Sequence, residues 1–168
     1  LREAFDPRQP GFGRAPRRIP HGAFLLLFEE TERRSDPSLL LPATATLDAI
    51  LASPMRDPDG GFFREAGEAD WSRPIEERTL ADNALLLRAL VAAHEATGKS
   101  SYADAAARLS VFLRTRLADE WGGFRHALSG GPSAERRDDR VFAFANGLAV
   151  SALLETGKEF EHPFDVIP

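Results

Sequence analysis

Residues 79–97 read TLADNALLLRALVAAHEAT, and this stretch decides the fold class. Its apolar residues form two adjacent stripes at helical spacing, one of Leu80, Ala84, Leu87 and Val91 and one of Leu86, Leu90 and Ala93. A helix that is apolar on two sides is buried between neighbouring elements. The stretch therefore predicts a central α-helix, and Gly98 supplies the left-handed residue that commonly ends one.

Four more helix patterns flank this stretch. Asp36 and Pro37 are a typical N-cap and first-turn pair, Ser100 or Ser101 is a candidate cap, and Gly157 is a candidate stop. The predicted helices cover residues 19–34, 37–53, 102–117 and 142–156. No segment alternates with period two for long enough to predict a sheet. The expected fold class is therefore all-α, built from antiparallel helical hairpins.

Three loops of similar sequence recur between the predicted hairpins. Residues 11–14 read GFGR, residues 59–64 read DGGFFR, and residues 120–125 read EWGGFR. The phenylalanines Phe12, Phe62 and Phe124 are 50 and 62 residues apart, which is the length of a helical hairpin with a long loop. We expect the three loops to lie on one rim of the array, with each Phe closing the end of a hairpin.

The composition excludes several classes of function. The 168 residues carry 21 Lys and Arg against 26 Asp and Glu, and this net charge of −5 lacks the basic excess of a nucleic-acid surface. With no cysteine there is no disulfide or thiol chemistry, and the four histidines form no metal-binding pair, so we expect no metal and no cofactor. No apolar run is long enough to span a membrane. We expect one cytoplasmic domain over residues 1–168, and the start at Leu1 suggests a piece of a longer chain.

One family resemblance covers most of the chain. Residues 60–86, GGFFREAGEADWSRPIEERTLADNALL, resemble a pattern of GGGF-x-R, a following Trp, and P-H-F-E-K-M-L-x-D-N-A. Residues 11–20, 138–140 and 146–148 resemble further motifs of the same family in the same order. That family is the thioredoxin-fused proteins that include the spermatogenesis-associated type.

The resemblance implies a fold and a class of ligand. The C-terminal part of that family is similar to the (α/α)6 toroid of six-hairpin glycosidases and N-acylglucosamine 2-epimerases. A full ring at this repeat length needs about 300 residues, so we expect a partial (α/α) toroid of about three hairpins. The family's partners would then be a carbohydrate or another small molecule, a thioredoxin domain, or a second copy that completes the ring.

Two departures from the family pattern bear on catalysis. Ile75 stands where the family has a His, and Ala145 stands where it has a Trp. We therefore expect a degenerate, non-catalytic toroid domain that binds a carbohydrate-like ligand or serves as a scaffold. A carbohydrate-active enzyme, either a glycoside hydrolase or a sugar epimerase, remains the alternative.

Two neighbouring groups of residues are candidates for a ligand site. Glu77 is the candidate catalytic group, although it could instead cap the helix or pair with Arg64, Arg73 or Arg78. Trp71, with Arg64 and Asp70 nearby, could be a stacking platform for a sugar, or else a partly buried rim aromatic.

Polar residues inside apolar helices are the remaining candidates. Asp82, Asn83 and Asn146 need partners if they are buried, because each unsatisfied group costs about 1–3 kcal/mol. We predict that Asn83 binds the backbone of a neighbouring loop and that Asn146 does the same one hairpin later, while all three residues remain ligand-binding candidates. Among the histidines, only His126 stands directly after one of the recurring loops.

Overall fold

The computed structural model describes residues 4–131 and 134–160. In this part of the chain there are five α-helices: α1 (His21–Arg34), α2 (Leu40–Ala52), α3 (Leu80–Thr97), α4 (Ser100–Arg116) and α5 (Ala143–Glu159). A short 3-10 helix (Pro37–Leu39) precedes α2. The five predicted helices are thus confirmed to within a few residues. However, Gly157 does not end α5, which continues to Glu159, and α4 begins after Lys99 without a side-chain cap.

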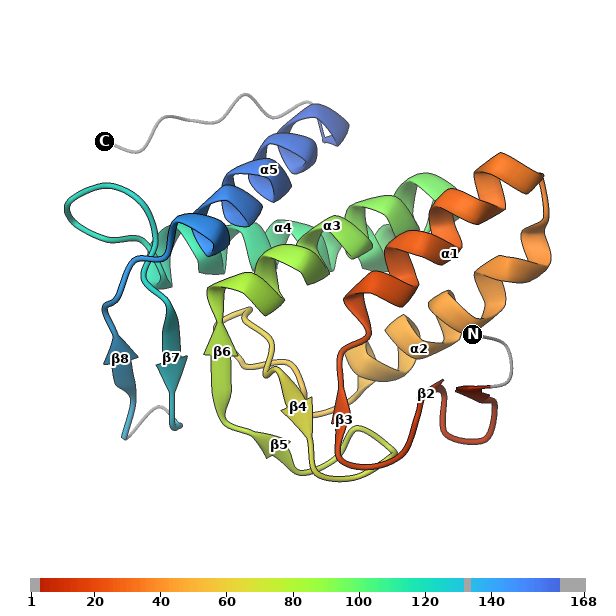
Figure 1. Ribbon diagram of the computed structural model, residues 1–168, viewed down its shortest axis with the longest axis horizontal. Coiled ribbons are helices and arrows are strands. Elements are labelled where there is room, and N and C mark those ends of the chain that lie inside the picture. Colours follow the sequence, from red (N-terminus) through yellow and green to blue (C-terminus); the bar gives the residue numbers. More distant parts are fainter. Residues whose placement is uncertain (1–3, 132–133, 161–168) are drawn as a thin grey trace.

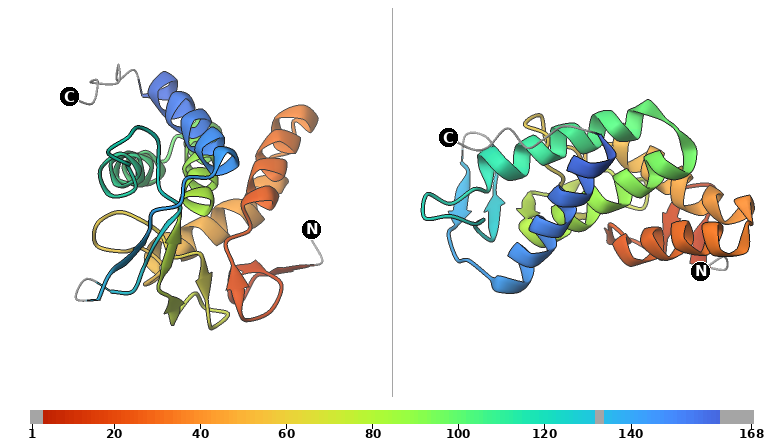
Figure 2. Two further views of the ribbon diagram at one scale, coloured as in Figure 1. Left: turned by 60° about the vertical axis from the view of Figure 1, so that its left-hand side comes forward. Right: turned by 90° about the horizontal axis from the view of Figure 1, so that it is seen from above.

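The helices form two layers. Figure 1 shows α1, α3 and α5 side by side and running in the same direction, with α2 and α4 behind them, and the view from above in Figure 2 agrees. Helix α3 contacts α1, α4 and α5. Its residues Leu80, Leu86, Leu87 and Leu90 are fully buried. The prediction of a central helix in an antiparallel hairpin array is therefore confirmed.

The expectation of an all-α fold is only partly met, because eight short strands occur in the described residues. They are β1 (Phe5–Asp6), β2 (Gly11–Phe12), β3 (Arg17–Arg18), β4 (Glu65–Ala66), β5 (Pro74–Ile75), β6 (Glu77–Thr79), β7 (Ala127–Ser129) and β8 (Arg136–Asp138). They pair antiparallel in the orders β1-β2, β3-β4-β5 and β6-β7-β8. Strands of two or three residues are too short to produce an alternating pattern, so the sequence gives no signal for them.

The three recurring loops share one backbone design. We call them the first (residues 6–12), second (residues 57–62) and third (residues 119–124) Gly-Phe loops. In each loop the opening Asp accepts a hydrogen bond at Oδ1 from the N–H two residues later, and in each the Phe pairs with the residue before that Asp. The second and third loops each follow an outer helix and lead to the strands before an inner helix, so they lie at the same end of the array (Figure 1).

Two asparagines fasten the second and third Gly-Phe loops to helices. Asn83 accepts a hydrogen bond from the N–H of Phe62 (2.8 Å) and donates one to its carbonyl oxygen (3.0 Å). Asn146 makes the same pair of bonds with Phe124, at 2.8 and 2.9 Å. The predicted role of these two residues is confirmed, since each side chain satisfies both backbone groups of one Phe.

No helix among the residues described combines the length and the apolarity that crossing a bilayer requires.

The Asn83 clamp makes a stability prediction. Asn83→Ala leaves the buried N–H and C=O of Phe62 without partners, so we expect the free energy of unfolding to fall by about 2–4 kcal/mol. Asn146→Ala removes the matching pair of bonds at a more exposed site, where water can replace them, and we expect about half that loss. Urea denaturation of both variants measures the difference. Equal losses, or a loss below about 0.5 kcal/mol for Asn83→Ala, would contradict the clamp.

Candidate functional site

Four polar side chains meet where α1 and α3 begin. His21 is the first residue of α1, and Asp82 lies in the first turn of α3. Arg64 follows the second Gly-Phe loop, and Glu77 begins β6, directly before α3. We call His21, Arg64, Glu77 and Asp82 the rim cluster.

Arg64 links the two carboxylates of the rim cluster. Its Nη1 donates a hydrogen bond to Oε2 of Glu77 at 2.5 Å, and its Nε lies 3.8 Å from Oδ2 of Asp82. The main-chain N–H of Arg64 also donates to the carbonyl oxygen of Glu77, at 3.0 Å. Glu77 is therefore an ion-pair partner of Arg64, as one of the two sequence-based interpretations predicted.

His21 completes the cluster from the neighbouring helix. Its Nε2 lies 3.4 Å from Oδ1 of Asp82, and only 10% of its side chain is exposed. Both ring nitrogens are buried, and while Nε2 has the contact with Asp82, Nδ1 has no hydrogen-bond partner among the described residues. An imidazole in contact with a carboxylate can exchange a proton with it.

The electrostatics of the cluster keep Asp82 ionised. Burial by itself raises the pKa of Asp82, but contacts with His21, Thr79 and Arg64 outweigh burial and hold the pKa below its usual range. The hydrogen bond to Glu77 raises the pKa of Arg64 further. Two carboxylates and one guanidinium, each partly exposed, thus present fixed acceptors and donors at the surface.

Trp71 is not available as a stacking platform. Only 1% of the residue is exposed, and its Nε1 donates a hydrogen bond to the carbonyl oxygen of Pro10 (2.8 Å). The β1–β2 segment covers the ring, and a Cβ on Gly11 would lie 3.2 Å from it. The stacking hypothesis is therefore wrong for this arrangement, because a segment about sixty residues earlier in the sequence buries the ring.

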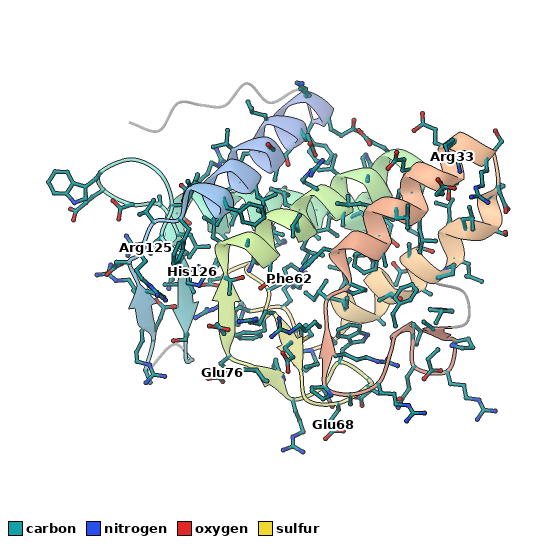
Figure 3. All side chains as sticks on the ribbon, viewed as in Figure 1. Arg33, Phe62, Glu68, Glu76, Arg125 and His126 are labelled. Carbon is teal, nitrogen blue, oxygen red and sulfur yellow. The ribbon has the colours of Figure 1, made fainter. Side chains whose placement is uncertain are left out.

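The other predicted site residues lie outside the rim cluster. Asp70 is exposed and holds a local turn by accepting hydrogen bonds from Ser72. The side-chain amides of Asn83 and Asn146 are occupied by the loop clamps, and each Nδ2 also donates to the carbonyl oxygen four residues earlier. His126 lies just before β7, beside the first turn of α3, where its carbonyl oxygen accepts from the N–H of Leu80 (Figure 3). Its ring packs edge-on against Phe142, with centroids 4.9 Å apart.

His21 is not among the site residues that the sequence predicted. The imidazole lies 61 positions before Asp82, and the fold brings the two together because α1 and α3 begin at the same end of the array. The available signal was its position at the start of a helix that follows a Gly-Phe loop. In the residues described, there is no group of three or more His, Asp or Glu side chains placed to hold a metal ion.

No protein-family model matches the sequence, and no curated protein matches it. Several solved structures, however, are similar to this chain. The cellobiose 2-epimerase from Spirochaeta thermophila DSM 6192 superposes with a TM-score of 0.79 at 20% identity, over 96% of this chain and 45% of that one. A sugar epimerase from a ruminal bacterium superposes with a TM-score of 0.78 at 17% identity, over 95% of this chain and 46% of that one. A family 76 glycoside hydrolase (mannosidase) from Bacteroides thetaiotaomicron VPI-5482 superposes with a TM-score of 0.71 at 11% identity, over 84% of this chain and 38% of that one.

These structures are six-hairpin (α/α) toroid enzymes, so the predicted partial (α/α) toroid is confirmed as the fold. The chain spans less than half the length of each of the three proteins. At identities of 20% and below, the likeness extends to the fold alone.

The lowered pKa of Asp82 predicts a pH dependence of stability. A carboxyl group whose pKa is lower in the folded chain stabilises the fold above its unfolded pKa, near 4, and this contribution is lost as the pH falls through the folded pKa. We expect the decline in unfolding free energy below about pH 4 to be shallower in Asp82→Asn than in the parent chain. Asp104→Asn, on the exposed side of α4, is the matched control and should leave the decline unchanged. If the unfolding free energy of Asp82→Asn fell with pH in the same way as that of the parent chain, the pKa of Asp82 would not be lowered in the fold.

Proposed function

We propose that this chain is a partial (α/α) toroid that binds a carbohydrate at the rim cluster without converting it. The observation that carries this proposal is the cluster itself, in which Arg64 bridges Glu77 and Asp82 where two inner helices begin. The shared fold with sugar epimerases and a glycoside hydrolase supports carbohydrate as the ligand class.

The chemistry of the cluster suits sugar hydroxyl groups. A hydroxyl donates one hydrogen bond and accepts others, so it can bridge an ionised carboxylate and a guanidinium. About a third of the Glu77 side chain and 29% of the Asp82 side chain are exposed, which leaves acceptor oxygens within reach of a ligand. Arg64 uses one N–H of its guanidinium on Glu77 and retains others for a ligand.

The arrangement favours binding over glycoside hydrolysis. Hydrolysis needs two carboxyl groups on opposite sides of the scissile bond, one of them protonated. Here a single arginine holds both carboxylates, and the lowered pKa of Asp82 keeps it ionised.

A sugar epimerase is the second candidate, and His21 is the observation that favours it. Ile75 stands where the resembled family has a histidine and is half-exposed on β5, but His21 places an imidazole nitrogen 3.4 Å from Asp82. A general acid or base of this kind is worth about 10²–10⁴ in rate. In this alternative, His21 transfers the proton, and Glu77 binds the sugar or assists the proton transfer.

Other expectations from the family resemblance stay predictions. They are attachment to a thioredoxin domain, membership of the spermatogenesis-associated type, and a cytoplasmic location.

Titration of a panel of mono- and disaccharides, followed by NMR, tests the proposed function. We expect saturable, weak binding that shifts the signals of the four rim-cluster residues, with no hydrolysis or epimerisation in parallel assays. Glu77→Gln removes a charged acceptor and should weaken binding by roughly tenfold, which corresponds to one charge-assisted hydrogen bond. Glu68→Gln is the control, because Glu68 is exposed at the bottom of the molecule and pairs with Arg73 (Figure 3).

Three outcomes separate the alternatives. Binding that Glu77→Gln weakens and Glu68→Gln does not supports the rim cluster as the ligand site. Epimerisation that is lost in His21→Gln would establish the enzyme and reject the non-catalytic proposal. If no sugar bound at any concentration, both candidate functions would be rejected.

A further inference from the structure

Arg78 is the centre of a buried group of charges behind β6. Neighbouring side chains of a strand point to opposite faces, so Glu77 lies at the rim while Arg78 points into the protein, where only 1% of it is exposed. Its Nη1 donates a hydrogen bond to Oδ2 of Asp57 at 2.6 Å, and its Nη2 donates to Oε2 of Glu135 at 3.0 Å. Nη2 also donates to the carbonyl oxygen of Gly130 at 3.0 Å. The guanidinium of Arg78 therefore connects the second Gly-Phe loop to the hairpin of β7 and β8.

Two further side chains complete this group. Arg116, at the end of α4, donates from Nη2 to both carboxylate oxygens of Glu135, at 2.7 and 2.9 Å. Asp59 lies between the two arginines, with its Oδ2 3.7 Å from Nη1 of Arg78 and 3.4 Å from Nη1 of Arg116. We call Asp57, Asp59, Arg78, Arg116 and Glu135 the ionic network. It joins the second loop, β6, α4 and the β7–β8 hairpin, whose strands lie beside β6 in Figure 1.

The ionic network contains more carboxyl groups than guanidinium groups. With all three carboxyls ionised against two arginines, it would carry a net charge of −1. The side chains of Arg78 and Asp57 are only 2% and 5% exposed, so water does little to compensate an unpaired charge beside them. A single proton held by one of the carboxyls makes the network neutral.

The contacts single out Asp59 as the carboxyl that holds this proton. Its Oδ1 is buried and has no hydrogen-bond donor among the described residues, although a buried ionised oxygen needs one. Asp57 and Glu135 each accept a hydrogen bond of 3.0 Å or less from an arginine, whereas Asp59 comes no closer than 3.4 Å to either. Burial, and then the hydrogen bond with the Asp57 carboxyl, raises the pKa of Asp59.

We propose that Asp59 keeps its proton in the fold and donates it to the Asp57 carboxylate, which makes the ionic network a pH-sensitive joint between the second Gly-Phe loop and the β7–β8 hairpin. At acid pH the network is neutral and holds the hairpin. When the proton leaves at higher pH, three carboxylates repel one another around two arginines, and the hold on the hairpin weakens. The exposed carboxylate of Glu76, which lies against Gly131 of the hairpin, adds to this negative charge.

The ionic network lies behind β6 and the rim cluster in front of it, so this proposal is independent of the proposed function. Carboxyl ¹³C NMR of the parent chain measures the proton directly. We expect the signal of Asp59 to titrate above the usual aspartate value of about 3.9, and the signal of Asp57 to shift in the same step because the two share the proton. An Asp59 signal that titrates at or below the usual value would overturn the proposal.

The variant Asp59→Asn distinguishes a shared proton from an ordinary ion pair by the sign of its effect. A carboxyl whose pKa is higher in the fold stabilises the fold below its unfolded pKa, near 4, and this contribution is lost as the pH rises through the folded pKa. Asparagine stays neutral and can still donate to Asp57. We therefore expect the urea midpoint of Asp59→Asn, relative to the parent, to shift upward between pH 3 and pH 7.

An ionised Asp59 paired with the two arginines would give the opposite shift, because the variant would lose the ion pair at pH 7 only. A relative midpoint that stays constant or shifts downward therefore contradicts the proposal. Asp104→Asn, on the exposed side of α4, is the matched control and should show no pH-dependent difference from the parent.

Hydrogen exchange tests whether the proton controls the joint. The amide of Gly130 donates to the carbonyl oxygen of Glu76 at 2.8 Å and so reports on contact between the hairpin and the chain before β6. As the pH rises through the midpoint of Asp59, its free energy of opening should fall relative to that of amides in the middle of α3, once the pH dependence of intrinsic exchange is removed. In Asp59→Asn it should stay constant. The same pH response in both chains would show that this proton does not control the hairpin.

Discussion

The pair of hydrogen bonds between Asn83 and the backbone of Phe62 is the contact on which the rest of the structure depends. Asn83 is buried in the first turns of the central helix, and its amide fixes the second Gly-Phe loop against that helix. Arg64 follows Phe62 by two residues, so the clamp also sets where its guanidinium lies. The ion pair with Glu77 and the approach to Asp82 are therefore consequences of a buried polar group that had to find a partner.

The same design occurs again with Asn146 and Phe124, and the difference between the two copies is informative. At the second loop the helix that follows α3 packs against the loop and encloses it. At the third loop, the described residues offer no such helix, and both the loop and one side of α5 are left open. The same loop design thus lies under a helix at one position and, within the described residues, at the surface at the next.

Sequence reasoning succeeded where the signal is local. The two-sided periodicity of residues 79–97 predicted a central helix, and the polar side chains of Asn83 and Asn146 inside apolar helices predicted the loop clamps. It failed where the determining contact is distant in the chain. His21 meets Asp82 only because two helices begin side by side, and Trp71 is covered by the segment around Pro10. The short strands form because loops pack against one another, and the periodicity of apolar residues does not reveal that packing.

Native-state hydrogen exchange tests most directly whether the Asn83 clamp holds the second loop and, through it, Arg64. The amide of Phe62 donates to Asn83, and the amide of Arg64 donates to Glu77. If the clamp organises this region, both amides exchange only through global unfolding, with the same free energy of opening as the core amides of α3. If instead these two amides exchange orders of magnitude faster than those of α3, the loop opens independently of the helix and the account is wrong.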